Sequence, residues 1–74
     1  MQEDIVMATI YEKLGDNIKH LRKKRNMSQE QLAMEAKLDL TTVSEIESGL
    51  RNPSVKTLAK FAKALNTTPS DLLK

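Results

Sequence analysis

The stretch from Ser28 to Gly49 constrains the fold of this chain more than any other, because its pattern predicts two short helices joined by a tight turn. Ser28 is followed three residues later by Gln31, the spacing of a capping box at a helix start. Asp39 and Thr41 are both suited to cap a second helix, and Gly49 supplies the left-handed residue that ends it. The sequence therefore predicts helices over residues 29–36 and 40–48, with the apolar side of one closed over that of the other.

Apolar residues upstream of this stretch recur at helical spacing. They predict a first helix from near Met7 to Arg25, with Asn26 as a left-handed residue after its end. The residues that carry the pattern are Ile10, Leu14, Ile18 and Leu21.

Two further helices are predicted downstream. Ser54 is placed to cap a fourth helix that closes at Asn66, and Thr68 with Pro69 at the first helical position starts a short fifth. The apolar stripe expected on the fourth helix consists of Val55, Leu58, Ala59, Ala62 and Leu65.

The architecture expected is all-α, since the chain has two glycines, two prolines and 3% aromatic residues, which leaves little support for a sheet. At 74 residues there is room for one domain, over residues 10–74, preceded by a tail or helix extension over residues 1–9. The expected core is Leu14, Ile18, Leu21, Leu32, Ala33, Ala36, Val43, Ile46, Leu58, Ala62, Leu65 and Leu72.

Several classes of protein are disfavoured by what the sequence lacks. The chain has no cysteine for a disulfide or thiolate metal site, and His20 is its one histidine, so a metal ligand is not expected. No combination of residues resembles a catalytic site, so we expect neither an enzyme nor a cofactor. No apolar run is long enough to span a bilayer and the acidic N-terminus is unlike a signal peptide, which predicts a soluble, cytoplasmic protein.

The net charge of +2 does not by itself identify a nucleic-acid binder, but the charges are unevenly distributed. Basic residues gather near the end of the first predicted helix, whereas the first twelve residues carry acidic residues and no basic one. Cations at a helix C-terminus also stabilise the helix dipole, so a purely structural role stays open. The basic residues are Lys19, Arg22, Lys23, Lys24 and Arg25.

An ordered set of residues across most of the chain resembles the Cro/CI-type (XRE) helix-turn-helix family of DNA-binding proteins. In size the chain is also similar to the small controller proteins of restriction-modification systems, although antitoxins and phage-type repressors look similar. The matching residues are Leu14-Gly15, Ile18, Leu21-Arg22, Ser28-Gln29, Leu32-Ala33, Val43-Ser44, Ile46-Glu47, Gly49, Asn52-Pro53-Ser54, Leu58, Ala62, Ala64-Leu65 and Leu72.

The resemblance implies a five-helix, lambda-repressor-like fold in which the third helix lies in the major groove of DNA and the second crosses the backbone. Threonine hydroxyls can contact either base, a threonine methyl suits thymine, and a glutamate can accept from cytosine N4. The candidate base-reading residues are Asp39, Leu40, Thr41, Thr42, Ser44 and Glu45.

Phosphate contacts and one structural ion pair are also implied by the resemblance. The pair joins Arg22 to Glu47 and holds the third helix against the first. A helix N-terminus offers free amides to an anion, which favours phosphate binding at the start of the second helix. The candidate phosphate-binding residues are Ser28, Gln29, Ser48, Arg51, Asn52, Lys23, Lys24 and Arg25.

The function predicted is that of a sequence-specific transcriptional regulator, a repressor or autoregulator, that binds a pseudo-palindromic operator in double-stranded DNA as a homodimer. The dimer interface is expected at Phe61, Leu65, Leu72 and Leu73, with an extension comprising Ile5, Val6, Met7 and Ile10 as a second possibility. The alternative is a protein-interaction module, such as an antitoxin or adaptor, which the two acids and Leu40 on the third helix favour.

Overall fold

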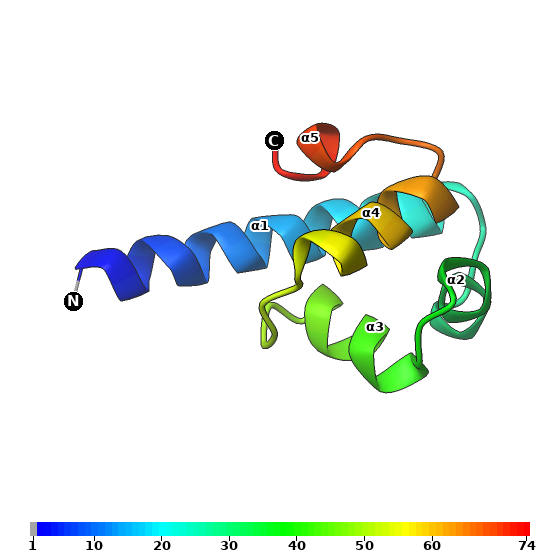
Figure 1. The fold of residues 1–74 in the computed structure, drawn as a ribbon, viewed down its shortest axis with the longest axis horizontal. Helices are drawn as coiled ribbons and strands as arrows, with labels where there is room; N and C mark the ends of the chain where they lie inside the picture. Colours follow the sequence, from blue (N-terminus) through cyan, green and yellow to red (C-terminus); the bar gives the residue numbers. More distant parts are fainter. Residues whose placement is uncertain (1) are drawn as a thin grey trace.

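The computed structural model describes the backbone of residues 2–74 and the side chains of residues 9–74. Five α-helices and no strand occur among these residues, which confirms the all-α prediction (Figure 1). None of these helices is long and apolar enough to cross a membrane. The helices are α1 (Gln2–Lys24), α2 (Gln29–Ala36), α3 (Leu40–Glu47), α4 (Val55–Ala64) and α5 (Pro69–Leu72).

Helix α1 is longer than the sequence predicted. It begins at Gln2 rather than near Met7, so the backbone of the segment expected to be a tail or a helix extension continues the helix. Its N-terminal part projects beyond the body formed by the other helices (Figure 1). At the other end the chain leaves the helix through Asn26, whose φ of 57° confirms the predicted left-handed residue.

The helix starts predicted from capping residues are confirmed. Ser28 and Gln31 form the capping box of α2, and Ser54 and Thr68 cap α4 and α5 with their hydroxyl oxygens. Asp39, not Thr41, is the N-cap of α3. Each cap satisfies a backbone N–H that would otherwise lack a partner in the first helical turn.

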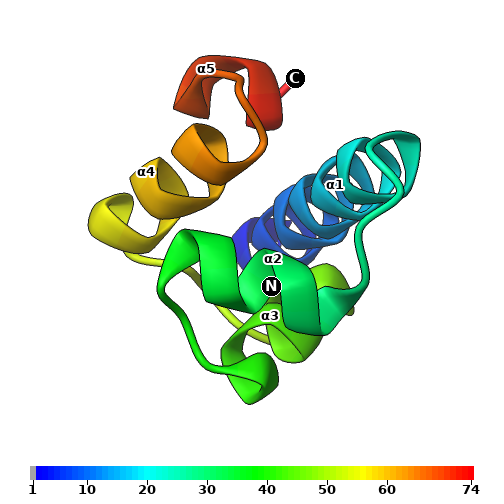
Figure 2. The ribbon, with the colours of Figure 1, turned by 90° about the vertical axis from the view of Figure 1, so that its right-hand side faces the viewer.

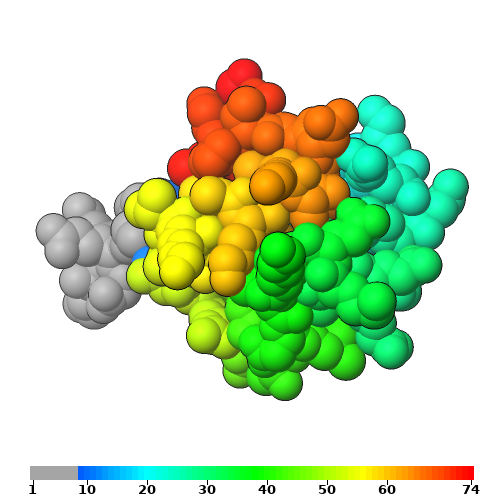
Figure 3. Space-filling view, turned by 45° about the vertical axis from the view of Figure 1, so that its right-hand side comes forward, coloured from blue at the N-terminus to red at the C-terminus, as the bar shows by residue number. Residues whose placement is uncertain are grey.

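The core lies where α1, α2, α3 and α4 meet, and α5 closes it from the C-terminal side (Figures 1 and 2). In the space-filling view the surface of α4 lies directly against that of α2 (Figure 3). Packing of aliphatic side chains with one aromatic ring provides the apolar burial that stabilises this small domain. The largest fully buried side chains are Phe61, Ile18, Leu32, Ile46, Leu72 and Val43.

The structure overturns most of the predicted dimer interface. Phe61, Leu65 and Leu72 are buried inside the single chain, so they cannot contact a second copy without unfolding. The reason is the path of α5, which folds back so that the Asn17 side-chain amide donates to the carbonyl oxygen of Leu72 at 2.8 Å. Of the four predicted residues, Leu73 remains exposed.

The predicted α4 stripe is wrong at two positions, Val55 and Ala59. Val55 is 82% exposed, because it begins the helix at the end of the body, where no other element covers it. Ala59 is also exposed. Of the second predicted interface, Ile10 is exposed, and the side chains of Ile5, Val6 and Met7 lie outside the described residues.

Helices α1 and α3 approach each other closely at Gly15. A Cβ atom there would lie 2.5 Å from the carbonyl oxygen of Ile46 and 2.6 Å from that of Glu47. Both are backbone atoms, so neither can move aside without moving α3. The absence of a side chain at Gly15 therefore sets the distance at which α3 is held.

Candidate nucleic-acid interface

Helix α3 lies on one side of the body with one face buried and the other open to solvent (Figure 1). Its buried side chains are Thr42, Val43, Ile46 and Glu47. The remaining four positions of the helix lie outside this buried side and form what we call the outward face of α3. They are Leu40, Thr41, Ser44 and Glu45.

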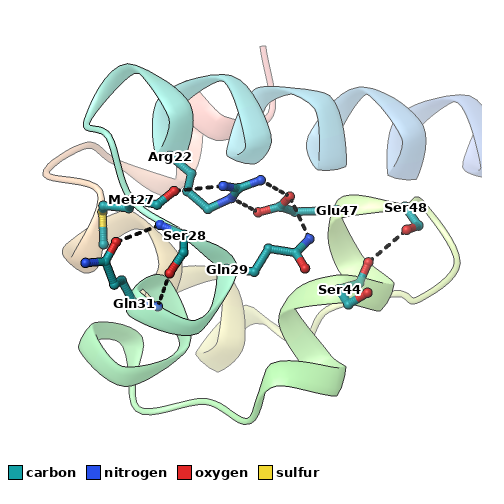
Figure 4. A network of polar contacts seen from close by, with 8 residues as sticks. All are labelled: Arg22, Met27, Ser28, Gln29, Gln31, Ser44, Glu47 and Ser48. Carbon is teal, nitrogen blue, oxygen red and sulfur yellow. Dashed lines mark hydrogen bonds and ion pairs between the residues drawn. The ribbon is translucent and has the colours of Figure 1, made fainter.

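A buried ion pair braces α3 from behind. The Arg22 guanidinium on α1 donates from Nε to Glu47 Oε2 at 2.7 Å and from Nη2 to Oε1 at 3.0 Å (Figure 4). The guanidinium and the carboxylate thus meet in a two-bond, fork-like geometry that fixes the orientation of both groups. The ion pair predicted from the sequence is present.

The bracing network also includes the turn before α2 and the first residue of α2. Arg22 Nη1 donates to the carbonyl oxygen of Met27 at 2.8 Å, and Gln29 Nε2 donates to Glu47 Oε1 at 3.1 Å (Figure 4). One arginine and one glutamate thereby connect α1, the start of α2 and the end of α3. The angle between α2 and α3 is held by hydrogen bonds as well as by apolar packing.

A second polar network ties the loop after α3 to the start of that helix. Arg51 Nη1 donates to Thr42 Oγ1 at 2.8 Å, and the Thr42 hydroxyl donates to Asp39 Oδ1. The hydrogen bond from Thr42 lowers the pKa of the Asp39 carboxyl, with backbone hydrogen bonds and the Arg51 charge acting in the same direction. Arg51 also lies 3.4 Å from Glu45 Oε1.

These contacts revise the set of predicted base-reading residues. Thr42 is 6% exposed and its hydroxyl is already bonded on both sides, so the prediction that it contacts a base is wrong. Asp39 is exposed, but its two oxygens accept from the Thr42 hydroxyl and from the Thr42 backbone N–H. Leu40, Thr41, Ser44 and Glu45 lie on the outward face, where contact with a groove is possible.

The predicted phosphate-binding residues fall into two groups. Ser28, Arg51 and Asn52 are exposed close to α2 or α3 along the chain. Gln29 is turned toward Glu47, and the Ser48 hydroxyl donates to the carbonyl oxygen of Ser44 at 2.9 Å (Figure 4). The Ser48 proton is therefore engaged in capping α3 and is not directed outward.

The exposed basic residues at the end of α1 are Lys23, Lys24 and Arg25, and they do not belong to the outward face of α3. Arg25 lines an open hollow of about 540 Å³ together with residues of α2 and α4, and no residue of α3 lines it. Its other basic residues are Lys37, Lys60 and Lys63. Lys23 and Lys24 are exposed in the last turn of α1. The structure does not group these cations with α3.

The link between Arg51 and α3 was missed by the sequence analysis, which assigned Arg51 to phosphate contact alone. No spacing rule signals it, because the guanidinium reaches α3 from a loop nine residues beyond Thr42. The sequence does carry one indirect signal. Residues 28–52 hold five acidic side chains and only two basic ones. A basic side chain in this stretch therefore has several carboxylates near it in the sequence with which it can form an ion pair.

The chain is similar in sequence to proteins whose family is known. The model of the helix-turn-helix family HTH_3 matches residues 18–72. The control protein C.BamHI of Bacillus amyloliquefaciens is 47% identical over 60 residues, which cover 80% of this chain and 74% of that protein.

A second control protein and a solved structure show the same similarity. The control protein C.SmaI of Serratia marcescens is 41% identical over 70 residues, covering 95% of this chain and 83% of the relative. The crystal structure of the restriction-modification controller protein C.AhdI from Aeromonas hydrophila superposes with a TM-score of 0.81 at 37% identity, covering 84% of this chain and 94% of that one.

Proposed function

The chain belongs to the helix-turn-helix family HTH_3, and from that membership we propose that it is a transcriptional regulator that binds operator DNA through α3. The observation that carries this proposal is the outward face of α3, which is polar or exposed along its length while the opposite face is locked to α1. A rigidly held helix with one free face is what insertion into a DNA groove requires.

The dimensions and chemistry of α3 suit the major groove. That groove is about 12 Å wide and admits an α-helix. Thr41 and Ser44 supply hydroxyls that donate or accept, and Leu40 near the N-terminus supplies an apolar contact for a thymine methyl. We therefore assign base reading to the outward face and no longer to Thr42.

Phosphate contacts are assigned to the start of α2 and to the loop after α3. The start of α2 presents the positive end of its helix dipole to an anion near Ser28, and Arg51 and Asn52 are exposed beside α3. Each phosphate neutralised by a cation contributes about 0.9 to the slope of log K against log salt concentration. Binding is therefore expected to weaken as salt rises.

We further propose that the regulator acts as a homodimer on a pseudo-palindromic operator. One small module buries limited surface on DNA, and two copies with half-sites about 34–36 Å apart give the specificity that one lacks. The self-contact is assigned to the end of the body from which α1 projects. Four of the exposed large apolar side chains belong to segments at this end, namely Ile10, Leu50, Val55 and Leu73 (Figure 1). We call this set the α1-exit surface.

Part of the α1-exit surface spans two neighbouring segments, α1 and the loop after α3. Gly49 lies against Glu12 of α1, since a Cβ at Gly49 would be 3.1 Å from the Glu12 Cγ atom. Leu50, the next residue, is therefore close to the projecting part of α1. An exposed apolar group of this kind favours contact with a second copy.

The biological setting follows from the proposed role and from the relatives' names. The relatives are named control proteins and controller proteins, and we propose that this chain likewise controls transcription, as a repressor or an autoregulator. Such a role requires access to chromosomal DNA and hence a place in the cytoplasm. It includes no enzymatic step.

The proposal is tested by titrating a fluorescent duplex pool of mixed sequence at two salt concentrations. The variant R51E should lose most duplex binding, whereas K63E, which reverses one charge on α4, should keep it. A circular dichroism melt of each variant checks that it is folded. The same loss in both variants, or wild-type protein that retains no duplex at low salt, would contradict the assignment and favour a protein-interaction module.

A further inference from the structure

Helix α3 and its cap carry three carboxylates, and one of them has oxygens left to accept a hydrogen bond from a ligand. Both oxygens of Glu47 accept from Arg22, and both oxygens of Asp39 accept from Thr42. The Glu45 carboxylate accepts one hydrogen bond among the described residues, from Arg51 Nη1 to Oε1 at 3.4 Å. Its side chain is 46% exposed.

Glu45 is also the one acid on the outward face of α3. It lies four residues after Thr41, so the two side chains are neighbours one turn apart on the same side of the helix. Arg51, itself 49% exposed, contacts Glu45 Oε1 from the loop, and Oε2 has no hydrogen-bond partner in the described part of the chain. A group that docks against this face meets a carboxylate that is about half exposed.

A carboxylate restricts what this face can bind, because at neutral pH it accepts hydrogen bonds and donates none. Phosphate and carbonyl oxygens repel it. In the major groove the donors are the amino groups at cytosine N4 and adenine N6. A base pair that turns no amino hydrogen toward Glu45 leaves the second oxygen of this carboxylate desolvated without a hydrogen-bond donor, which is costly.

We propose that Glu45 makes operator binding depend on an unmethylated exocyclic amino group, at cytosine N4 or adenine N6, in each half-site. This inference rests on the proposed function, in which α3 occupies the major groove. It adds a regulatory property, since binding would be switched off by methylation of that amino nitrogen. Cytosine and adenine offer Glu45 the same group, an amino hydrogen whose hydrogen bond the carboxylate can accept, and the experiment distinguishes the two bases.

The effect of methylation follows from base-pair geometry. An amino group in a base pair uses one hydrogen for pairing and presents the other in the major groove. A single methyl group on that nitrogen must take the groove side, because the other hydrogen is needed for pairing. The donor that Glu45 requires is then replaced by an apolar group. A methyl group at cytosine C5 leaves the amino hydrogens in place and provides a control.

The experiment begins with an operator selected from a random duplex pool by the wild-type protein. Duplexes are then prepared with N4-methylcytosine or N6-methyladenine at each amino-bearing position of one half-site, and with 5-methylcytosine at the same cytosines. Dissociation constants are measured by fluorescence anisotropy for wild type, E45A and E35A. The E35A variant removes the same charge from an exposed position on α2, away from α3.

The expected result is a loss of wild-type affinity of about tenfold or more at one position of the half-site on amino methylation, and a ratio near one at that position for E45A. The E35A variant should keep the wild-type ratio. The inference is overturned if amino methylation changes wild-type affinity nowhere in the site, or if E45A discriminates as wild type does. Failure of the wild type to select any duplex would instead contradict the proposed function itself.

Discussion

At the scale of single residues, the contact between Arg22 and Glu47 has the largest expected effect on stability. Both side chains are buried and meet through two hydrogen bonds, so removing one leaves the other charge buried without a partner. Such a loss costs about 3 to 5 kcal/mol. We predict that Glu47→Ala lowers the melting temperature by well over ten degrees in a circular dichroism melt, at about 4 to 8 °C per kcal/mol for a domain of this size.

The matched control for this prediction is Glu30→Ala. Glu30 is an exposed glutamate in the first turn of α2 and has no ion pair within the described residues. Its removal should change the melting temperature by a few degrees at most. If Glu47→Ala melts no lower than Glu30→Ala, the pair does not stabilise the fold and the bracing of α3 must come from apolar packing alone.

The Thr42 hydroxyl is the second residue-scale feature with a measurable consequence. It donates to Asp39 and lowers the pKa of that carboxyl below 3.8. Because the native pKa is depressed, the ionised cap stabilises the fold above the unfolded pKa, and this contribution is lost as the pH falls through the native value. We predict that Thr42→Val raises the pKa of Asp39 toward 3.8, as followed by an NMR titration of its carboxyl carbon.

The titration has a clear contrary outcome. If the Asp39 pKa is the same in wild type and Thr42→Val, the hydroxyl is not the group that lowers it. Asp71 is an internal reference. Its pKa is lowered mainly by Lys74 and also by hydrogen bonds from Thr68 and Thr67. All three residues are remote from Thr42 in the chain. Its titration should not change in the variant.

At the scale of helices, α1 and α3 approach each other closely at Gly15. We predict that Gly15→Ala destabilises the fold by about 1 to 3 kcal/mol, as expected of overpacking, although alanine is the better helix former by about 1 kcal/mol. The cause is the contact of a new Cβ with the carbonyl oxygens of Ile46 and Glu47. Urea denaturation measures the change in the free energy of unfolding, and Asp16→Ala at the adjacent exposed position is the control.

A stabilised Gly15→Ala protein would show that α1 and α3 can separate without cost. Asp16→Ala keeps the change in helix propensity but adds nothing to the α1–α3 contact, since Asp16 is exposed. The difference between the two variants therefore isolates the steric effect. It should be accompanied by weaker duplex binding, because α3 is the element displaced.

Helix ends were predicted correctly because the signals for them are local. The capping box of Ser28 with Gln31, the cap at Ser54 and the left-handed Asn66 each involve residues a few positions apart. The early start of α1 at Gln2 and the left-handed Lys37 at the end of α2 were missed. Neither residue type is a strong helix start or stop signal.

Residues that depend on how the helices assemble could not be predicted to the same degree. Phe61, Leu65 and Leu72 are apolar and near the C-terminus, which suits both a core and an interface. The sequence does not specify how α5 folds back, and that path buries all three. The tie between Arg51 and Thr42 has the same origin, since it depends on the course of the loop after α3.

At the scale of the whole molecule, the proposed dimer makes a prediction about self-association. Val55→Glu places a charge on the α1-exit surface and should shift sedimentation equilibrium toward monomer, since a buried unpaired charge opposes association. Met34→Glu is the matched control, because Met34 is similarly exposed, at 79%, but lies on α2. Equal association constants for the two variants would exclude this surface as the self-contact.

The most direct test of the central claim is selection of bound fragments from a random duplex pool by the wild-type protein, followed by sequencing. The account predicts an enriched motif made of two inverted half-sites whose centres are about one helical turn apart, and loss of that motif with Ser44→Glu, which changes the outward face of α3. Recovery of no motif, or of the same motif by the Ser44→Glu variant, would contradict recognition of DNA by this helix.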